Sequence, residues 1–497
     1  MSPRRIFGAR RLERDTLVLF AIVVAAAVAR FVNLDLMEFK GDEAEAMRLA
    51  LHVLGFSEPG GGRFFPTAGL TSNVGVPNPA LFIYLIALPL AVVRSPLAAA
   101  SLVAASNVVA VWLTYLVGKR YYSSFVGLSA AALFALSPWG IIFSRKIWAQ
   151  DTLPIFATLF LLQLHALLVE KRPRALCWLI ILVAAATQIH FSAWILPIIL
   201  LVAIMVGRRT IEWRWALLGI AGAVALYAPF LAYHTRQAYD DAVAASSSSA
   251  PDAIHRFLTS VHFMFSISGG DYLHESLGSQ SGLARPVSLI LGPAAFVGLL
   301  AACRHWRASP EGQLRVLIAV WYVLPLAAMM ILPFVVYIHY FIILYPLPFL
   351  GLAYVIECII RHRRMIGGIA LASCLCSFAI LDGQIYRTVV RDGGAPGDYG
   401  VAYKYKAETA ALIEGENPDR EFELGTDVQL DPSNFDEYKV LVWNSDVSNA
   451  QSKPAATGYA IIDTMTESPP NLTADPTTAS YKTHQFGPLE IISIPLK

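Results

Sequence analysis

The sequence is poor in charged residues. Of its 497 residues only 15% are Asp, Glu, Lys or Arg, whereas 56% are hydrophobic and the mean hydropathy is +0.55. A soluble domain carries about 25% charged residues, so this chain lacks the polar surface to enclose a globule of its size. The same composition excludes a disordered chain and a disulfide-rich scaffold. It predicts a protein whose surroundings are mostly lipid.

The sequence also lacks a surplus of one charge and has few cysteines. Its formal net charge is +2, which leaves no large basic face and argues against a nucleic-acid partner. The cysteines lie within or at the ends of apolar runs, which is typical of small core residues rather than of disulfides or metal ligands. They are Cys177, Cys303, Cys358, Cys374 and Cys376.

The common catalytic signatures of soluble enzymes are missing as well. The sequence has no Walker A loop, no GxGxxG motif opening a βαβ unit, no HExxH and no GxSxG. It also has no repeat of 20 to 50 residues. The missing motifs, together with the short cytoplasmic loops, argue against the use of a nucleotide on the cytoplasmic side.

Long apolar runs are what the sequence has in abundance. Eleven runs are long enough to cross a bilayer, and a further run, 79–93, is shorter. If 79–93 crossed, the side of every later loop would be reversed. The eleven runs are 16–32, 97–118, 125–143, 152–169, 174–189, 192–207, 215–232, 286–303, 316–334, 339–358 and 365–381.

The loop charges indicate that 79–93 does not cross. In that case six clusters of Lys and Arg fall on one face, which the positive-inside rule makes cytoplasmic. If 79–93 crosses, the N-terminal tail opposes the other five clusters. We therefore predict eleven spans, with 79–93 as a juxtamembrane or re-entrant helix on the outer face; merging of the 174–207 hairpin would change the count by a pair. The clusters are Arg4, Arg5, Arg10, Arg11 and Arg14; Lys119 and Arg120; Lys171, Arg172 and Arg174; Arg208, Arg209 and Arg214; Arg304, Arg307 and Arg315; and Arg361, Arg363 and Arg364.

The basic tail before the first run resembles a signal peptide, and residues 25–27 (Ala-Ala-Ala) could mark a cleavage site. We expect an uncleaved signal anchor instead, because informative residues follow at once and later spans also hold the chain in the membrane. The expectation is a multi-pass protein of the cytoplasmic (inner) membrane with its N-terminus inside.

Three larger pieces remain for the outer face: 33–96, 233–285 and 382–497. The last is acidic, and its short apolar bursts between Pro, Gly, Asn and Asp are typical of strands. The predicted strands are at 440–443, 460–462 and 491–494, and the predicted helix is at 401–414. The predicted fold is thus an all-α polytopic membrane module over 1–381, with a small soluble extracytoplasmic α/β domain over 382–497.

Loop 233–285 holds a run of four serines, 246–249, and few periodic signals. We expect it to be partly helical and mobile, and it could act as a lid or bind an acceptor.

In so apolar a chain, ionisable groups at the membrane surface are the informative ones. The first cluster is 40–45, Lys-Gly-Asp-Glu-Ala-Glu. Helix capping explains much of it, with Asp42 as N-cap and Glu45 as its capping-box partner, and leaves Glu43 incidental. A catalytic role for these acids is the alternative.

A second cluster, 144–151, lies in the outer turn between the runs 125–143 and 152–169. Asp151 could again cap a helix. Arg145 and Lys146, however, are adjacent cations on the face with little positive charge, and a nearby anion would explain them.

Two further clusters lie at outer span ends. One contains Gln188 and His190, and the other contains His339 and Tyr340. A lone interfacial His is more often structural than catalytic, and Tyr belongs to the aromatic belt in any case.

The predicted topology brings all four clusters to one water–lipid boundary. Carboxylates, imidazoles and cations there suit a substrate with an anionic head and a lipid tail. The cations would bind a phosphate, and a carboxylate would take a proton from the incoming nucleophile.

These clusters recur in an order that resembles a known superfamily. Asp42-Glu43 follows the first span, Pro79 opens the juxtamembrane stretch and His339-Tyr340 precedes Tyr345-Pro346. Between them lie the turn 118–121, Ser137-Pro138, Ser144-Arg145 and Asp151. Over roughly 15–360 the chain resembles the GT-C superfamily of membrane glycosyltransferases that use polyprenyl-phosphate sugars, in the branch of protein O-mannosyltransferases and bacterial lipid A aminoarabinose transferase.

The resemblance implies roles for individual residues. Asp42 would be the catalytic base with Glu43 beside it, Asp151 would be a second acid that shapes the site, and Arg145 would bind the lipid phosphate. Asn78 is a departure, because some relatives have Lys before the proline. His190 lies in a turn where relatives have Lys, so it could be a replacement cation or a hydrogen-bond donor.

The chemistry agrees with these roles. The leaving group of a polyprenyl-phosphate sugar is a stable phosphate, which needs charge stabilisation rather than a strong general acid. One base then suffices for a single displacement with inversion, unlike glycosidases with their two carboxylates. We expect Asp42 to be the base, and Arg145, with Lys146 or His190, to bind the phosphate. The remaining predicted substrate-binding residues are Asn78, Gln188, His339 and Tyr340.

Cofactor and partner expectations follow. Asp42, Glu43 and Asp151 could instead hold a divalent cation, but we expect no obligatory metal or other cofactor. The expected partners are a polyprenyl-phosphate-linked sugar donor, an acceptor on protein, lipid A or a glycan, and the lipid bilayer.

Two rival functions give other expectations. A lipid-linked sugar transporter or flippase would carry ionisable residues near the bilayer midplane and often an internal repeat, whereas the span interiors here hold only isolated polar groups such as Asn107 and Gln163. A structural or signalling protein with an outer sensor domain would leave the clustered outer charges without a common purpose.

Overall fold

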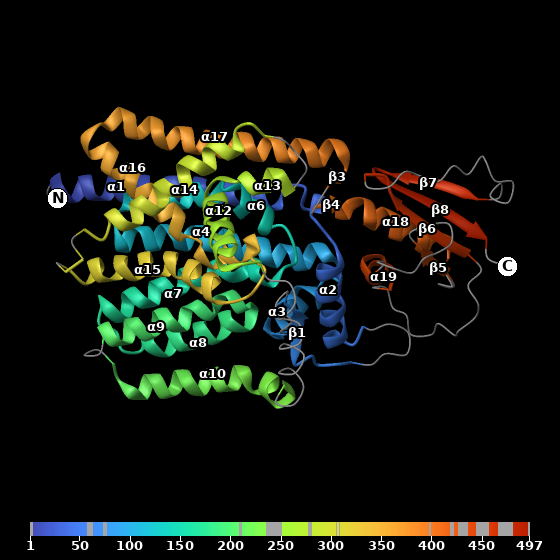
Figure 1. The fold of residues 1–497 in the computed structure, drawn as a ribbon, viewed down its shortest axis with the longest axis horizontal. Coiled ribbons are helices and arrows are strands. Elements are labelled where there is room, and N and C mark those ends of the chain that lie inside the picture. Colours follow the sequence, from blue (N-terminus) through green and yellow to red (C-terminus); the bar gives the residue numbers. More distant parts are fainter. Residues whose placement is uncertain are drawn as a thin grey trace.

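The protein is described by a computed structural model in which helices predominate (Figure 1). The N-terminus and the C-terminal sheet lie at opposite ends of the longest axis (Figure 1). The described residues are 3–56, 63–72, 77–207, 211–234, 251–276, 281–304, 306–307, 309–396, 399–417, 422–425, 436–443, 457–465 and 481–495.

The larger part of the chain is a helical bundle. Its helices are α1 (Pro3–Phe31), α4 (Pro96–Tyr121), α5 (Ser124–Ala135), α6 (Pro138–Phe143), α7 (Leu153–Leu168), α8 (Ala175–Ile189), α9 (Ile195–Val206), α10 (Trp213–His234), α12 (Ala253–Gly269), α13 (Asp271–Ser276), α14 (Ala284–Ala301), α15 (Pro310–Ile331), α16 (Leu347–His362) and α17 (Arg364–Asp392). Short 3-10 helices connect some of them: η1 (Leu34–Leu36), η2 (Ala149–Thr152), η3 (Phe191–Trp194) and η5 (Ile338–Leu344).

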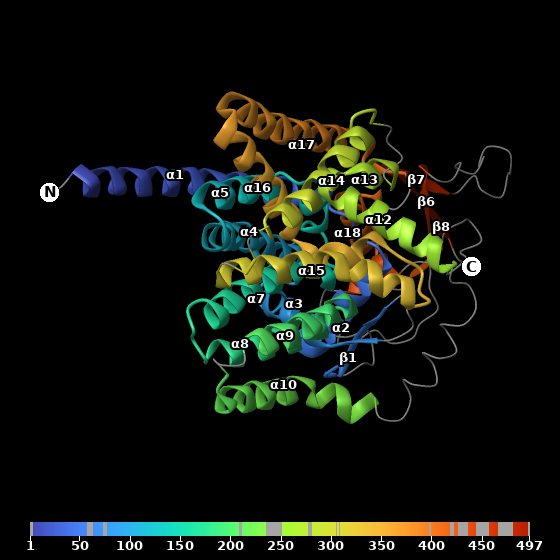
Figure 2. The same ribbon diagram turned by 60° about the vertical axis from the view of Figure 1, so that its left-hand side comes forward.

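Among the described residues, six helices are long and apolar enough to cross a bilayer, or seven if η5 and α16, bent by 59°, form one span. The predicted fold class is thereby confirmed in its coarse form, a helical multi-pass membrane protein with small sheets towards its C-terminal end. The count of eleven spans stays a prediction. Figure 2 shows α1 extending beyond the other helices and α10 at the edge of the bundle.

Ser-Pro pairs begin three of these helices. The side chains of Ser95, Ser137 and Ser309 each accept a hydrogen bond from a backbone N–H two or three residues on, and the proline takes the first helical position. Both features suit a helix N-terminus, where backbone donors lack partners and the fixed φ of proline is already helical. The local sequence therefore determines where α4, α6 and α15 start.

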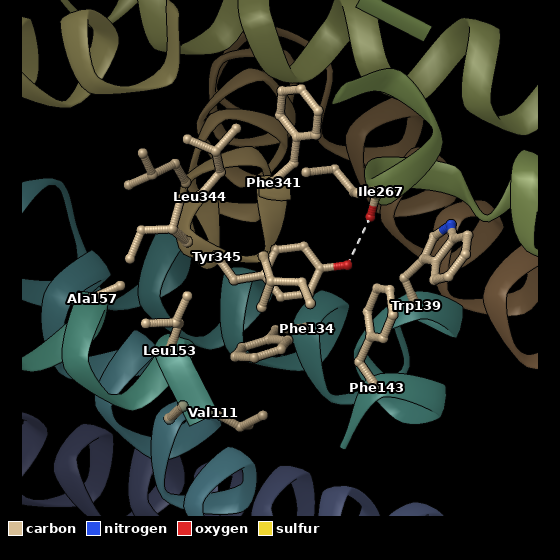
Figure 3. Packing of buried hydrophobic residues seen from close by; sticks show 14 of the residues in the cluster. Val111, Phe134, Trp139, Phe143, Leu153, Ala157, Ile267, Phe341, Leu344 and Tyr345 are labelled. Atoms are coloured by element: carbon tan, nitrogen blue, oxygen red, sulfur yellow. Dashed lines mark hydrogen bonds between the residues drawn. The ribbon is translucent and has the colours of Figure 1, made fainter. Parts of the chain in front are cut away.

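The bundle is held together by close helix contacts and an aromatic core. Gly298 of α14 faces Gly351 of α16 so closely that a Cβ on Gly298 would lie 2.1 Å from the Gly351 carbonyl oxygen. Small residues of this kind let helices approach in a membrane, where apolar surface alone drives no association. In the core, the Tyr345 hydroxyl donates to the Ile267 carbonyl at 3.0 Å, and Trp139 stacks on Phe143 (Figure 3).

Between α1 and α4 the chain forms a compact piece of α2 (Gly41–Leu54), an antiparallel pair β1 (Ala68–Thr71) and β2 (Pro77–Pro79), and α3 (Leu81–Leu90). Helix α3 corresponds to the short apolar run. Its ten residues span about 15 Å, half of a hydrocarbon core of about 30 Å. It is too short to cross by itself. In loop 233–285 the described part is helical, in α12 and α13, whereas the serine run lies outside the described residues.

Helix α17 continues past residue 382 and leads into the C-terminal piece. This piece contains the hairpin β3 (Gly394–Ala395) and β4 (Gly400–Val401), α18 (Tyr403–Glu416), β5 (Phe422–Gly425), α19 (Asp436–Trp443), β6 (Thr457–Asp463), β7 (Lys482–Phe486) and β8 (Leu489–Pro495). The last four strands form one sheet in the order β5-β6-β8-β7, with β5 parallel to β6 and the other pairs antiparallel.

The predicted helix 401–414 is confirmed as α18, and the predicted strands 460–462 and 491–494 lie within β6 and β8. The predicted strand 440–443 is wrong, because these residues form the second half of α19. Tyr438 and Val442 pack into the core of the C-terminal piece, while Val440 packs against the bundle. A short apolar run buried on both faces has no periodicity that separates a strand from a helix.

The five cysteines are free, as predicted. The expectation that they are core residues is wrong, since four are half-buried and Cys376 on α17 is exposed. Helix faces that contact lipid need no polar residue, so an apolar sequence neighbourhood does not distinguish them from a core.

Candidate active site

Helix α2 begins at Gly41, so the predicted catalytic acids Asp42 and Glu43 lie in its first turn. Its N-cap is Lys40, and Glu43 at the third helical position accepts a hydrogen bond from the Lys40 backbone N–H at 3.0 Å. The predicted cap, Asp42 with Glu45, is therefore wrong. Glu45 instead forms an ion pair with Arg48 at 2.6 Å. Among the described residues, none forms a hydrogen bond or ion pair with the Asp42 carboxylate.

That carboxylate faces a cavity of about 530 Å³. Five segments far apart in the sequence form its walls: the start of α2, α6 with the following turn, the α12–α13 corner, the residues around η5, and Tyr399 of the C-terminal piece. The polar lining residues are Glu38, Lys40, Asp42, Glu43, Lys146 and His339, and the aromatic ones are Trp139, Phe143, Trp148, Phe263, Tyr272, Tyr337 and Tyr399.

A buried ion-pair network lies at one side of this cavity. The two carboxylate oxygens of Glu38 bind Lys146 Nζ at 2.9 Å and Lys40 Nζ at 3.0 Å. The Lys146 ammonium also lies 3.4 Å from the centroid of the Trp148 ring, a cation–π contact. Burial opposes the charge of Lys146, but Glu38, Glu43 and Asp151 outweigh it and raise the pKa of Lys146, which keeps it a cation.

The third predicted acid, Asp151, is buried behind this network. Its backbone carbonyl accepts a hydrogen bond from Asn107 Nδ2 at 2.8 Å, while neither oxygen of its carboxylate has a partner among the described residues. Asp151 does not cap α7 with its side chain, because the N-cap of that helix is Thr152. Its carboxylate is near enough to contribute to the raised pKa of Lys146.

A second, smaller cavity of about 80 Å³ adjoins the first. Its walls come from the β1–β2 pair with Asn78, the start of α3, the turn around Gln150, and His190. Asp42, Trp148 and His339 line both cavities. The unpaired carboxylate of Asp42 therefore lies where the two spaces meet.

The surroundings of α2 raise the pKa of both neighbouring acids. Burial, and next the charge of Glu38, raise the pKa of Glu43 to about 7. Burial also raises the pKa of the half-accessible Asp42, although Lys146 opposes the effect. A carboxylate with a raised pKa holds a proton more tightly, which suits a general base.

His190 is neutral rather than a replacement cation. Burial lowers its pKa to about 3, and its Nδ1 accepts a hydrogen bond from the Ser192 backbone N–H at 3.3 Å. The proton then resides on Nε2, so the alternative role of hydrogen-bond donor is the one that this geometry allows. The His190 ring lies 5.8 Å from that of His339, which in turn contacts the Trp148 ring.

Arg145 lines neither of these two cavities, so its role as the phosphate ligand stays a prediction. Its guanidinium donates to the carbonyl oxygens of Ala29 at 3.1 Å, Val32 at 2.8 Å and Asn33. These carbonyls lie in or just after the last turn of α1, where backbone acceptors have no partner within the helix. Arg145 borders a separate space of about 290 Å³ between α1 and α17.

The other predicted binding residues take supporting positions. The Asn78 side chain donates to the Leu70 carbonyl at 3.2 Å and so holds β1 to β2 where they line the smaller cavity. Tyr340 is buried with its ring 4.7 Å from those of His339 and Phe191. Gln188 is buried at the end of α8, and its amide nitrogen has no partner among the described residues.

Comparison with known proteins identifies this arrangement. Residues 77–233, less than half of the chain, match the family model described as dolichyl-phosphate-mannose-protein mannosyltransferase. The structure of ArnT from Cupriavidus metallidurans bound to undecaprenyl phosphate superposes with a TM-score of 0.55 at 12% identity, covering 95% of this chain and 97% of that one. The chain has the GT-C fold. The predicted resemblance to that superfamily is confirmed.

Two more GT-C structures are similar. ArnT from the same organism in the apo state gives a TM-score of 0.54 at 12% identity and covers 96% of this chain and 98% of that one. The oligosaccharyltransferase of Archaeoglobus fulgidus, tethered with an acceptor peptide containing an NVT sequon, gives 0.50 at 14% identity and covers 82% and 57%. No curated protein matches the chain by sequence.

Within this GT-C fold, sequence reasoning missed Glu38 and Trp148. Glu38 left a signal, because it is an acid between Met37 and Phe39 in a stretch where apolar residues dominate, two positions before Lys40. Tyr399 left none, since only the tertiary fold brings it to the cavity. Within the described residues, no three His, Cys, Asp or Glu side chains are arranged to hold a metal ion.

Proposed function

We propose that this protein is a membrane glycosyltransferase that moves a monosaccharide from a polyprenyl-phosphate-sugar donor to an acceptor hydroxyl, on the outer face of the cytoplasmic membrane. The observation that carries the proposal is the unpaired Asp42 carboxylate at the meeting point of two cavities, with the buried cation Lys146 beside it. The GT-C fold supports the same reaction class, since the known structures with this fold include ones that hold undecaprenyl phosphate or an acceptor peptide.

The donor occupies the larger cavity in this proposal. Its phosphate binds Lys146 and the more accessible Lys40, which both form ion pairs with Glu38, whose single negative charge balances only one of them. An ammonium is a good point charge for phosphate, and burial beside Trp148 strengthens the attraction. The aromatic side chains Trp139 and Tyr272, stacked at 6.2 Å, provide an apolar wall for the rest of the head group.

The acceptor approaches through the smaller cavity. Asp42 takes the proton of the acceptor hydroxyl while its oxygen attacks the anomeric carbon. The bond between that carbon and the phosphate oxygen breaks, and the electron pair leaves with the phosphate, whose charge Lys146 and Lys40 stabilise. One displacement of this kind inverts the anomeric configuration.

The supporting residues have defined parts. Glu43 fixes the first turn of α2 through its bond to Lys40, so it orients Asp42 rather than reacting itself. Asp151 lies near Lys146 and favours its charged form, after Glu38 and Glu43, although burial raises the pKa of Asp151 well above its usual range. His190 offers its Nε2–H towards the smaller cavity, where it can hold an acceptor oxygen.

The transporter alternative has less support. It expects ionisable groups within the spans that are available to a cargo. Arg30, the fully buried cation of α1, is instead occupied by the carbonyl oxygens of Phe134, Ala135 and Gly140 at 2.9 to 3.3 Å. Such a residue joins helices and leaves no charge for a pathway.

The proposal is tested with a panel of polyprenyl-phosphate monosaccharides, both hexoses and pentoses, by following the release of polyprenyl phosphate from each. We expect the wild type to consume at least one donor, and Asp42→Asn to lower the turnover by roughly 100- to 10,000-fold, the usual contribution of a general base. The matched control is Glu45→Gln. Glu45 lies three residues after Asp42 on α2 and pairs with Arg48, so this variant should retain activity.

Donor binding and the thermal unfolding midpoint of Asp42→Asn should equal those of the wild type, because this carboxylate makes no contact that holds the fold. The proposed function fails if the wild type consumes no donor on the panel. The assignment of the base fails if Asp42→Asn turns over within tenfold of the wild type.

A further inference from the structure

The four residues before the N-cap of α2 are held by a segment more than 350 positions further along the chain. The Tyr399 hydroxyl donates to the Leu36 carbonyl, and the Tyr403 backbone N–H donates to the Met37 carbonyl at 2.9 Å. Both donors belong to residues 399–406, which we name the docking segment. It comprises Tyr399, β4, Ala402 and the first turn of α18.

The contacts continue through the next two residues. Glu38 and Ala402 pair as an antiparallel β-bridge, and Lys406 Nζ donates to the Phe39 carbonyl at 2.7 Å. Lys406 is buried, and its second partner is Glu437 of α19 at 2.7 Å. Every residue from 36 to 39 is therefore held on its backbone by the docking segment.

Two glycines determine where the docking segment lies. Gly394 approaches the opposite strand of the β3–β4 hairpin so closely that a Cβ would lie 2.2 Å from the Gly400 carbonyl oxygen. Gly400 has a φ of +68°, in the left-handed region that favours glycine. These two glycines therefore restrict the geometry of the hairpin, in which Tyr399 directly precedes β4 and Ala402 directly follows it.

The residues held in this way are part of the candidate site. Glu38 binds both Lys146 and Lys40 with its carboxylate, and Lys40 is the N-cap of the helix that carries Asp42. A shift of residues 36–39 would move Asp42 relative to Lys146, across the cavity where donor and acceptor meet. Tyr399 itself lines this cavity.

We propose that the docking segment is a positioning element of the active site, with Tyr403 and Lys406 as its positioning residues. It sets the distance between the base and the phosphate-binding cations through the backbone of residues 36–39. Tyr403 and Lys406 thereby take part in transfer although neither lines the cavity. The inference rests on the proposed function.

The first test compares Lys406→Met with Glu437→Gln. Both variants break the Lys406–Glu437 ion pair, but only the first removes the bond to the Phe39 carbonyl. A misplacement of about 1 Å costs on the order of 100-fold in rate, so we expect Lys406→Met to lower kcat by about 10- to 100-fold. Glu437→Gln should stay within about threefold of the wild type, and Lys406→Arg should recover much of the loss because it still donates.

The second test removes a backbone donor. Tyr403 is the first residue of α18, a position that tolerates proline, and Ala402 has φ −66° and ψ 145°, the conformation that precedes proline. Tyr403→Pro therefore deletes the N–H bonded to Met37 without opposing the helix, and Tyr403→Ala is the control that loses only the ring. We expect kcat to be lower in the proline variant than in the alanine variant.

Two further readouts separate positioning from mere destabilisation. The acidic limb of the pH–rate profile, measured per folded molecule, should shift in Lys406→Met, because Glu38 affects the pKa values of both Asp42 and Glu43. Hydrogen exchange of the amides in 36–45 should accelerate at least tenfold, while that of 96–121 stays unchanged. If Lys406→Met does not fold, the comparison at Tyr403 decides.

The outcomes are distinguishable. Unchanged kcat, pH profile and exchange in both Lys406→Met and Tyr403→Pro, with an active wild type, overturn the inference. A wild type that is inactive on every donor rejects the proposed function. Accelerated amide exchange of 36–45 in Lys406→Met and Tyr403→Pro would then still show that the docking segment stabilises the start of α2.

Discussion

Two adjacent carboxylates in α2 have different environments. Glu43 is buried and bound to the Lys40 backbone, whereas Asp42 faces two cavities and makes no such bond. The sequence identifies both acids as candidates but does not distinguish them. The distinction depends on where the helix begins, because with Lys40 as the N-cap it is Glu43 whose side chain accepts the Lys40 backbone N–H.

Glu43 gives the protein a predictable pH dependence. Its pKa in the folded state is about 7, above the ordinary value of 4.5, so the folded state binds the proton more tightly than the unfolded state. The stability that this proton contributes is complete below about pH 4.5 and is lost as the pH rises through 7. The thermal unfolding midpoint of the wild type should therefore fall between pH 5 and pH 8.

The variant Glu43→Gln removes this titration while its amide oxygen can still accept the Lys40 N–H. We expect a flatter dependence of its unfolding midpoint on pH over the same range, measured by differential scanning fluorimetry in detergent. Equal slopes for variant and wild type would show that Glu43 does not titrate in this range.

Arg145 and Lys146 are adjacent in the sequence but have different partners: Arg145 binds carbonyls at the end of α1, whereas Lys146 pairs with Glu38. We expect Lys146→Gln to raise the donor KM at least tenfold, because a buried phosphate ligand is lost. Arg145→Gln should lower the unfolding temperature, since α1 loses the donor to its last carbonyls, and leave the donor KM within about threefold. Steady-state kinetics with a polyprenyl-phosphate sugar measure the KM of both variants, and thermal melts measure their unfolding temperatures. A raised KM in Arg145→Gln with an unchanged KM in Lys146→Gln contradicts the assignment.

At the scale of elements, local sequence was a good guide where capping decides the structure. Ser-Pro pairs lie at the starts of α4, α6 and α15, and the short apolar run 79–93, which the loop charges place outside the spans, contains the ten-residue helix α3. The local sequence predicted the wrong secondary structure for α19, whose apolar run is buried on both faces. Its partners there, α2 and the C-terminal sheet, are set by the tertiary fold.

The contact between α14 and α16 allows a direct test of helix packing. A Cβ on Gly351 would lie 2.2 Å from the Ala295 carbonyl oxygen, a backbone atom that cannot move without the helix. Gly351→Ala should therefore lower the unfolding temperature and the yield of folded protein.

Gly368 in α17 is the matched control, because nothing lies within 4 Å of its Cβ position. Gly368→Ala should be neutral or slightly stabilising, as alanine favours a helix by about 1 kcal/mol over glycine. Equal midpoints for the two variants, measured in the same detergent, would contradict the close approach of α14 and α16.

At the scale of the whole molecule, the sequence predicted that distant polar clusters meet at one end of the bundle. Asp42, Lys146 and His339 do line one cavity. Arg145 lies outside that cavity, because adjacent residues in a turn can face opposite sides, and its partners are carbonyls at the end of α1. The contribution of Tyr399 could not be predicted either, since it depends on the docking of the C-terminal piece.

The proposed function requires a lipid phosphate to bind Lys146 and Lys40 inside the cavity that Asp42 lines. An experimental structure of the wild-type protein with bound polyprenyl phosphate tests it most directly. The account predicts a phosphate oxygen at about 3 Å from Lys146 Nζ, the usual length of a charge-assisted hydrogen bond, inside the cavity that Asp42 lines. A phosphate bound to Arg145 in the space between α1 and α17, with the Asp42 cavity empty, would contradict it.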